Sequence, residues 1–246
     1  MGSSYRTATR PALIALMGLV LLSPLAAQQI HLRTLAATGT TEQIRAALDA
    51  GADFNDHDYS GVTALMAAAA TNRDPGVVLV LIRYGAVVDA RDRNGETALM
   101  LAAERNGDAS VVAELVKGGA ALESRDLFGR TALMHAAMAN SSVQVTDALL
   151  KAGARVNARD SYGLTALLYA AWVGQNGEVA LALLAAGADA TARSSSGRTL
   201  MDLAQDNPRV RGDAALLHQL QEAVDGTRSS AQRPVAGGPS AEKDAS

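Results

Sequence analysis

The chain has 246 residues, a formal net charge of -3, no cysteine, and few aromatic residues: five Tyr, two Phe and one Trp. Its hydrophobic content of 48% is too high for wholesale disorder, and because alanine supplies much of it, we expect closely packed thin helices. The composition excludes disulfides and thiolate sites, its four scattered histidines do not favour a histidine-only metal site, and it has no basic excess for nucleic acid. We therefore expect no cofactor, no metal and no nucleic-acid partner.

The first 27 residues have the three parts of a secretory signal peptide. Arg6 and Arg10 precede an apolar run over 12–22, and small residues follow as far as Ala27. The alternative, a retained membrane anchor, needs about 20 apolar residues, which this run does not reach. The leader predicts export to the bacterial periplasm or beyond, cleavage near Ala27 and no membrane span in the mature chain.

A period of 34 residues organises the rest of the chain. A Gly-x-Thr motif begins at Gly61, Gly95, Gly129, Gly163 and Gly197. Gly-Ala pairs begin at Gly51, Gly85, Gly119, Gly153 and Gly187. Because two separate markers share one spacing, we expect six units, at about 28–60, 61–94, 95–128, 129–162, 163–196 and 197–225.

Each unit has the signals of two short helices and an extended turn. A threonine starts each first helix, at Thr63, Thr97, Thr131, Thr165 and Thr199. An N-cap residue precedes each second helix, at Asp74, Asp108, Ser142 and Asn176. Their side-chain oxygens accept free amide hydrogens of the first helical turn. Thr40, with Gln43 three residues on, predicts the same start in the first unit, and the glycines of the Gly-Ala pairs predict left-handed stops.

The apolar residues of each helix fall on one face. At about 100° per residue, the second, third, sixth and seventh positions from the starting Thr lie together. In the second unit these are Ala64, Leu65, Ala68 and Ala69. Neither helix can cover its own apolar stripe, so stability must come from stacking on neighbouring units. We expect an all-α solenoid of about six helix-turn-helix units joined by hairpin-like turns.

Both ends of the array are more polar than its middle. The first unit lacks the Thr-Ala-Leu motif and exposes Arg33, Glu42 and Arg45, and the last ends in a polar helix near 213–224. Polar outer faces keep an open solenoid soluble. Residues 226–246 are rich in Ser, Gly, Pro and Ala, so we expect a flexible tail.

The Thr-Ala-Leu-Met-x-Ala-Ala motif, the Gly-Ala pair and the turn over 157–163 together resemble the ankyrin repeat. The resemblance covers about 28–225, nearly the whole mature chain. There are two departures: the period is 34 residues instead of about 33, and Thr-Ala-Leu-Met stands where the family has Thr-Pro-Leu-His. The resemblance implies a binding protein that holds its partner in a concave groove.

A row of aspartates recurs in the turns, at Asp58, Asp92, Asp126 and Asp160. Carboxylates in a row could hold a metal, but their fixed phase favours turns in which each side chain bonds its own backbone. The arginines one place earlier should be exposed charges along the turn edge: Arg91, Arg125, Arg159 and Arg193. No Gly-x-Ser-x-Gly or His-Glu-x-x-His motif occurs, so we expect no enzyme.

The residues that break the repeat are the candidates for partner binding. The fifth and eighth positions of each first helix lie about 160° from the stacked face, so they should point outward into the groove that the resemblance implies. The candidates are Leu101, Glu104, His135, Met138, Tyr169 and Trp172, with Phe128 and Tyr162 at the turn tips. Aromatic residues and Met are typical of interface centres. The alternative is that Tyr169 and Trp172 only fill space against Met138 and Leu203.

The sequence thus predicts a non-catalytic, monomeric scaffold for an unidentified protein partner. Two roles stay open at this point: an inhibitor of a toxic or secreted protein, and an accessory, stress-protection or assembly factor for a periplasmic enzyme. An enzyme that uses the groove is the least favoured interpretation.

Overall fold

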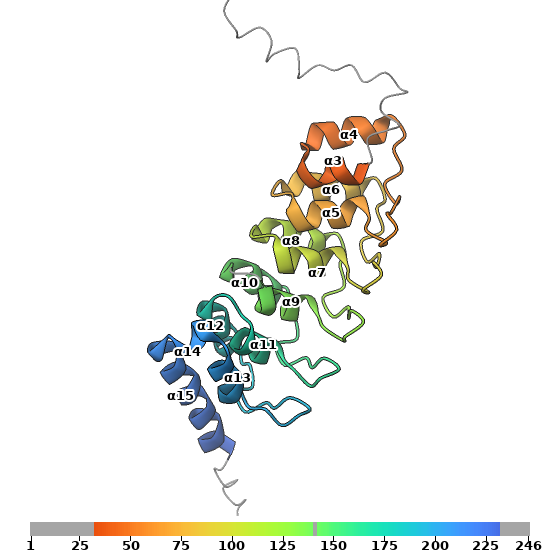
Figure 1. Ribbon diagram of the computed structural model, residues 1–246. Coiled ribbons are helices and arrows are strands. Elements are labelled where there is room, and N and C mark those ends of the chain that lie inside the picture. The colour runs from red at the N-terminus through yellow and green to blue at the C-terminus, as the bar shows by residue number, and fades with distance from the viewer. Residues whose placement is uncertain (1–31, 140–141, 232–246) are drawn as a thin grey trace, which may run out of the picture.

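The computed structural model describes residues 32–139 and 142–231. The expected signal peptide, 1–27, and residues 232–246 of the expected tail lie outside the described residues. The described part is a stack of helix pairs, from α3 and α4 at one end to α15 at the other (Figure 1). None of its helices combines the length and the apolar character needed to cross a bilayer.

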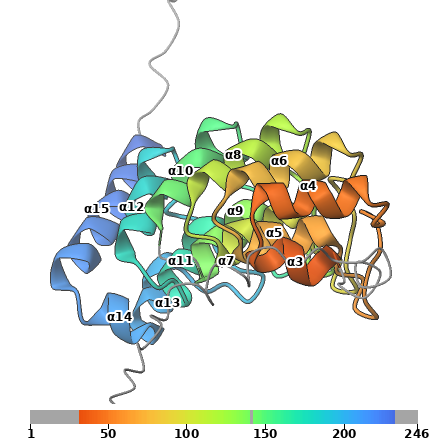
Figure 2. The same ribbon diagram turned by 90° about the horizontal axis from the view of Figure 1, so that it is seen from above.

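The helices form two layers, and the turns project from one side of the stack (Figures 1 and 2). The first helices of the units are α3 (Leu32–Thr38), α5 (Ala64–Thr71), α7 (Ala98–Arg105), α9 (Ala132–Ala139), α11 (Ala166–Trp172) and α13 (Leu200–Asp206). The second helices are α4 (Thr41–Asp49), α6 (Pro75–Arg83), α8 (Ala109–Lys117), α10 (Val143–Lys151) and α12 (Gly177–Ala185). Each helix packs on its counterpart in the next unit, which confirms the predicted solenoid.

The predicted helix caps are largely present. Thr40 forms a capping box with Gln43, and the threonines before α5, α7, α11 and α13 each accept an amide hydrogen from the first turn. Asp74, Asp108 and Asn176 cap second helices in the same way. Ser142 precedes α10 as predicted, but its hydroxyl donates to the carbonyl of Gly107 at 3.2 Å. The caps are local, so sequence spacing alone places them.

The core consists of the small apolar face predicted for the first helices. Ala64, Leu65, Ala68 and Ala69 are all buried, and so are their counterparts in the third, fourth and fifth units. The glycine stops are also present, as at Gly119 with φ of 94°. A Cβ on Gly95, at φ of 76°, would lie 3.1 Å from the backbone nitrogen of Leu127, so the turns approach too closely for a side chain there.

Hydrogen bonds connect each turn to the next. Every turn tip after the first donates one amide to the preceding tip, as Ser161 does to Phe128 at 3.0 Å and Ser195 to Tyr162 at 2.8 Å. The turn aspartates have the predicted structural role: Oδ1 of Asp160, for example, accepts from the amides of Tyr162 and Leu164. The result is a row of turns in fixed register.

Two side-chain series that join the units were not predicted. The Arg91 guanidinium donates to the carbonyls of Gly95 and Arg125, and Arg125 and Arg159 repeat the pattern one unit on. These arginines are exposed, as expected, but they also join consecutive turns. Buried Asn106 donates to the carbonyls of Ala69 and Asn72 and so joins α5 to α7.

The last unit differs from its prediction. A short helix, α14 (Pro208–Arg211), precedes α15 (Ala214–Ala231), so residues 226–231 are helical and do not belong to the expected tail. Leu216, Leu220 and Val224 are buried where α15 packs on α12, α13 and α14. The helix continues past this contact, where Thr227 Oγ1 donates to the carbonyl of Ala223 at 2.8 Å. When one end of a helix packs on its neighbours, the helix extends more easily. The amino-acid composition of residues 226–231 does not reveal this effect.

Candidate partner-binding surface

The fifth position of the first helices does not point outward, contrary to prediction. Leu101, His135 and Tyr169 are buried, and Tyr169 is only 5% exposed. At the eighth position, Glu104 and Met138 are partly buried and Trp172 is 38% exposed. Side chains at the fifth position are therefore part of the buried core, and those at the eighth lie at the edge of the exposed surface.

The turn that precedes each first helix causes this burial. The Tyr169 hydroxyl donates to Oδ2 of Asp160 at 2.6 Å, and the His135 ring nitrogen Nε2 lies 3.1 Å from Oδ2 of Asp126. Burial, and then the bond to Asp160, raise the pKa of the Tyr169 phenol, so it stays protonated and can donate. A helical wheel counts only the helices and omits the turn that covers this position.

Exposed apolar side chains gather in the second half of the stack. Phe128 and Tyr162, both predicted, are 46% and 55% exposed at their turn tips. Leu127 and Val173 are also exposed and were not predicted. Leu127 had a usable signal, because it is the one aliphatic residue at this turn position, where the other turns have Tyr59, Arg93, Ser161 and Ser195. We call Leu127, Phe128, Tyr162, Trp172 and Val173 the apolar surface.

A hollow of about 550 Å³ opens beside this surface, between the fifth and sixth units. We call it the C-terminal hollow. It is lined by Tyr162, Leu164, Tyr169, Trp172, Leu203, the serines 194–196 and Arg198. The Trp172 ring stacks on Tyr169, with the ring centres 6.5 Å apart and the planes at 21°. Arg198 pairs with Asp206, so its charge is compensated. The hollow therefore has aromatic and aliphatic walls with a hydroxyl rim.

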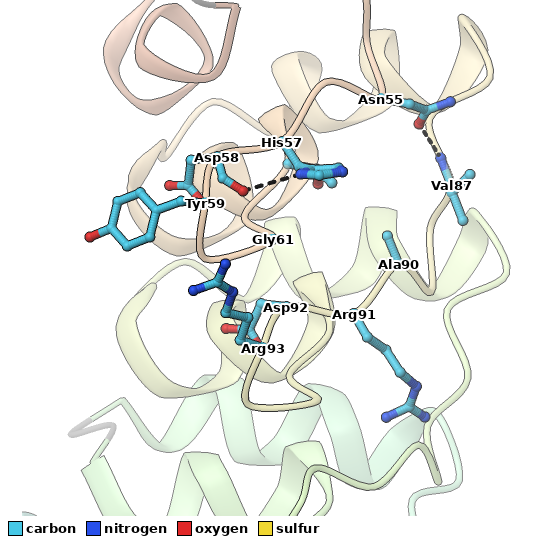
Figure 3. A pocket seen from close by; sticks show the side chains of 11 residues that line it. Asn55, His57, Asp58, Tyr59, Gly61, Val87, Ala90, Arg91, Asp92 and Arg93 are labelled. Atoms are coloured by element: carbon cyan, nitrogen blue, oxygen red, sulfur yellow. Dashed lines mark hydrogen bonds between the residues drawn. The ribbon is translucent and has the colours of Figure 1, made fainter.

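A second hollow, also of about 550 Å³, lies between the first two turns (Figure 3). We call it the N-terminal hollow. Charged and polar residues dominate its wall, and Tyr59, 82% exposed, lies against the Arg93 guanidinium at 5.8 Å. Arg91 extends away toward the following turn (Figure 3), where it bonds the Arg125 carbonyl. Its exposed large apolar side chains are Tyr59 and Val87, and no aromatic ring stacks on another there as Trp172 does on Tyr169.

Phe128 occupies a mixed environment between the two hollows. The Arg130 guanidinium lies over its ring at 4.8 Å, and Arg130 Nε donates to Oδ2 of Asp126 at 2.6 Å. Because Asp126 holds the guanidinium, one face of the Phe128 ring is covered. The contact with Arg130 thus partly fixes the position of the Phe128 ring.

Comparison with known families supports the repeat assignment. A model described as "Ankyrin repeats (3 copies)" matches residues 32–126 and 99–194, which together cover more than half of the chain. Comparison with curated proteins finds no match. The matched region contains the apolar surface and the row of turns as far as residue 194. The chain therefore belongs to the ankyrin-repeat family, and its stacked units form a protein–protein interaction module.

Proposed function

We propose that the chain is an exported, non-catalytic binding protein that captures a protein partner on the apolar surface and in the C-terminal hollow. The observation that carries this proposal is Trp172, whose large ring stays 38% exposed beside an open apolar hollow. Tyr162 and Phe128 extend the same surface along the turn tips. The leader over residues 1–27 supports a location in the periplasm or outside the cell.

The energetics favour recognition by these side chains. Tyr162 and Trp172 line one hollow, and exposed large apolar side chains that gather in this way are typical of interaction sites. Anchors of the Trp or Tyr type contribute about 2 kcal/mol or more when a partner desolvates them. The hydrogen-bonded turns hold Phe128 and Tyr162 in place before binding, so little conformational entropy is lost.

Partner capture tests the proposal. The chain from residue 28 onward is immobilised and exposed to an envelope fraction, in parallel with W172A and Y59A. Tyr59 is the matched control, because it is an exposed aromatic residue of the N-terminal hollow. We expect the native chain and Y59A to retain one stoichiometric partner and W172A to lose it, with unchanged melting temperatures. Equal capture by W172A, or loss in Y59A alone, would contradict the proposal.

The activity of the captured partner distinguishes the two roles. A partner that loses its activity in the complex identifies an inhibitor, and one that needs the complex for activity or assembly identifies an accessory factor. Turnover by the chain without a partner would contradict a non-catalytic role.

A further inference from the structure

A cluster of metal-ligating side chains lies on the N-terminal side of the apolar surface. His135 on α9 lies near Glu104 on α7 and near two turn residues, Glu96 and Asp126. The side chains of His135, Glu96 and Asp126 are 3%, 9% and 0% exposed. One donor atom each from these three residues fits within 4.8 Å of the others. The fold brings together residues that the sequence separates by up to 39 positions.

Asp126 fixes the tautomer of His135. Its Oδ1 accepts the backbone amides of Phe128 and Arg130, and its Oδ2 accepts Arg130 Nε, so this carboxylate is an acceptor. His135 Nε2, 3.1 Å from Oδ2, must therefore carry the hydrogen. The other ring nitrogen, Nδ1, thus presents a lone pair.

That lone pair faces two carboxylates. Nδ1 lies 4.0 Å from Oε1 of Glu96 and 3.9 Å from Oε2 of Glu104, too far for direct hydrogen bonds. Oε2 of Glu104 is buried without a hydrogen-bond donor, although Arg105 Nε lies 3.4 Å away on a more exposed side chain. The other Glu96 oxygen turns toward the Asn94 amide at 3.5 Å. Nδ1 therefore lies about 4 Å from one oxygen of each glutamate without a hydrogen bond to either, an arrangement that a bound cation would stabilise.

We propose that His135 Nδ1, Glu96 and Glu104 bind one divalent transition-metal ion of the zinc type. Two carboxylates and a neutral imidazole balance a charge of 2+, and a mixed nitrogen and oxygen set suits zinc better than calcium or magnesium. Asp126 holds the imidazole in the ligating tautomer, as carboxylates do at many metal-bound histidines. Glu96 also lines a hollow of about 370 Å³, which gives an ion a route of access.

The geometry needs a small adjustment. Tetrahedral zinc with bonds of about 2.0–2.1 Å holds its ligand atoms about 3.3–3.5 Å apart. The two separations from Nδ1 exceed this by about half an ångström. Rotation of the glutamate side chains can close that gap, because Glu104 borders the surface and one Glu96 oxygen has only a long bond to Asn94. A water molecule would complete the coordination.

Cobalt serves as the spectroscopic probe. The untagged chain from residue 28 onward is titrated with CoCl₂ at neutral pH, and ZnCl₂ is then added. We expect visible absorption bands that saturate at one equivalent of Co²⁺ and disappear when Zn²⁺ replaces it. We expect E104Q to weaken Co²⁺ binding at least tenfold, and D126N, which removes the charge behind His135, roughly 10–100-fold. Circular dichroism confirms that both variants fold.

Two controls identify the site. E114Q changes a carboxylate on α8 that pairs with Lys117, and it should bind cobalt as the native chain does. H218A removes the exposed His218–Glu222 pair, which could bind metal adventitiously, and should also leave binding intact. The proposal is overturned if no bands form, or if H218A loses them while E104Q keeps them. Partner capture by W172A is a separate readout, so either proposal can fail alone.

Discussion

The N-terminal and C-terminal hollows have similar volumes and both lie between consecutive units, but their walls have different chemistry. In the N-terminal hollow, Tyr59 extends into water beside Arg93. In the C-terminal hollow, Trp172 stacks on a buried Tyr169, whose hydroxyl is bonded to the turn. Along the stack, Ala67 and Ala70 of the second unit stand where the fifth unit has Tyr169 and Trp172. The comparison teaches that a repeat array builds a recognition site by enlarging a few side chains on a constant frame.

The largest expected difference lies in the turn aspartates of the two hollows. D160A leaves two backbone amides and the buried Tyr169 hydroxyl without their acceptor, so it should lower the free energy of unfolding by about 4 kcal/mol. D58A loses two amide bonds and a 3.6 Å ion pair with Arg33 at a less buried site, so it should lower the free energy of unfolding clearly less than D160A does. Urea denaturation of both variants measures the difference. Equal losses would show that the two turns are equivalent.

Partner affinity should separate the hollows next. W172A removes the exposed ring of the C-terminal hollow, so it should weaken partner binding by about 2 kcal/mol, or roughly 30-fold. Y59A should change affinity less than about twofold, because its ring lies in the other hollow. Calorimetric titration of the captured partner measures both. A larger effect from Y59A would reverse the assignment of the two hollows.

Tyr169 should affect stability without affecting recognition. Y169F removes only the hydroxyl that donates to Asp160, so we expect a loss of about 1–2 kcal/mol in the free energy of unfolding. Partner affinity should stay unchanged, because the ring that supports Trp172 is kept. Thermal unfolding and the same titration test the two statements. An affinity loss as large as that of W172A would place the phenol in the interface.

The smallest difference in the free energy of unfolding should come from the arginines that join consecutive turns. R91M and R159M each remove a guanidinium that joins two turns, one near each hollow. Both arginines are exposed, so each variant should cost about 1 kcal/mol, and the two should agree within about 0.5 kcal/mol. Urea denaturation of the pair checks this. Clearly different stability losses for R91M and R159M would mean that the bonds between turns also differ between the two hollows.

The sequence predicts the local features of this fold well. The helix starts, the glycine stops and the aspartate turns all follow from short-range spacing, as at Thr63 and Asp160. It fails where one segment covers another: Tyr169 is placed on the surface because the helical wheel omits the turn. It also gives no signal for the Arg91 bridges, whose acceptors lie 4 and 34 residues away. For the candidate site, Phe128, Tyr162 and Trp172 are found at exposed positions, and Leu127 is missed.

Trp172 allows a direct test of whether the partner occupies the C-terminal hollow, because it is the one tryptophan in the sequence. The chain labelled with 5-fluorotryptophan gives a single ¹⁹F resonance, which is followed by NMR as the captured, unlabelled partner is added. If the partner occupies the C-terminal hollow, this resonance shifts and loses its sensitivity to replacement of H₂O by D₂O at one equivalent of partner. A resonance that stays in place and remains sensitive to solvent while the partner is stoichiometrically bound would contradict the account.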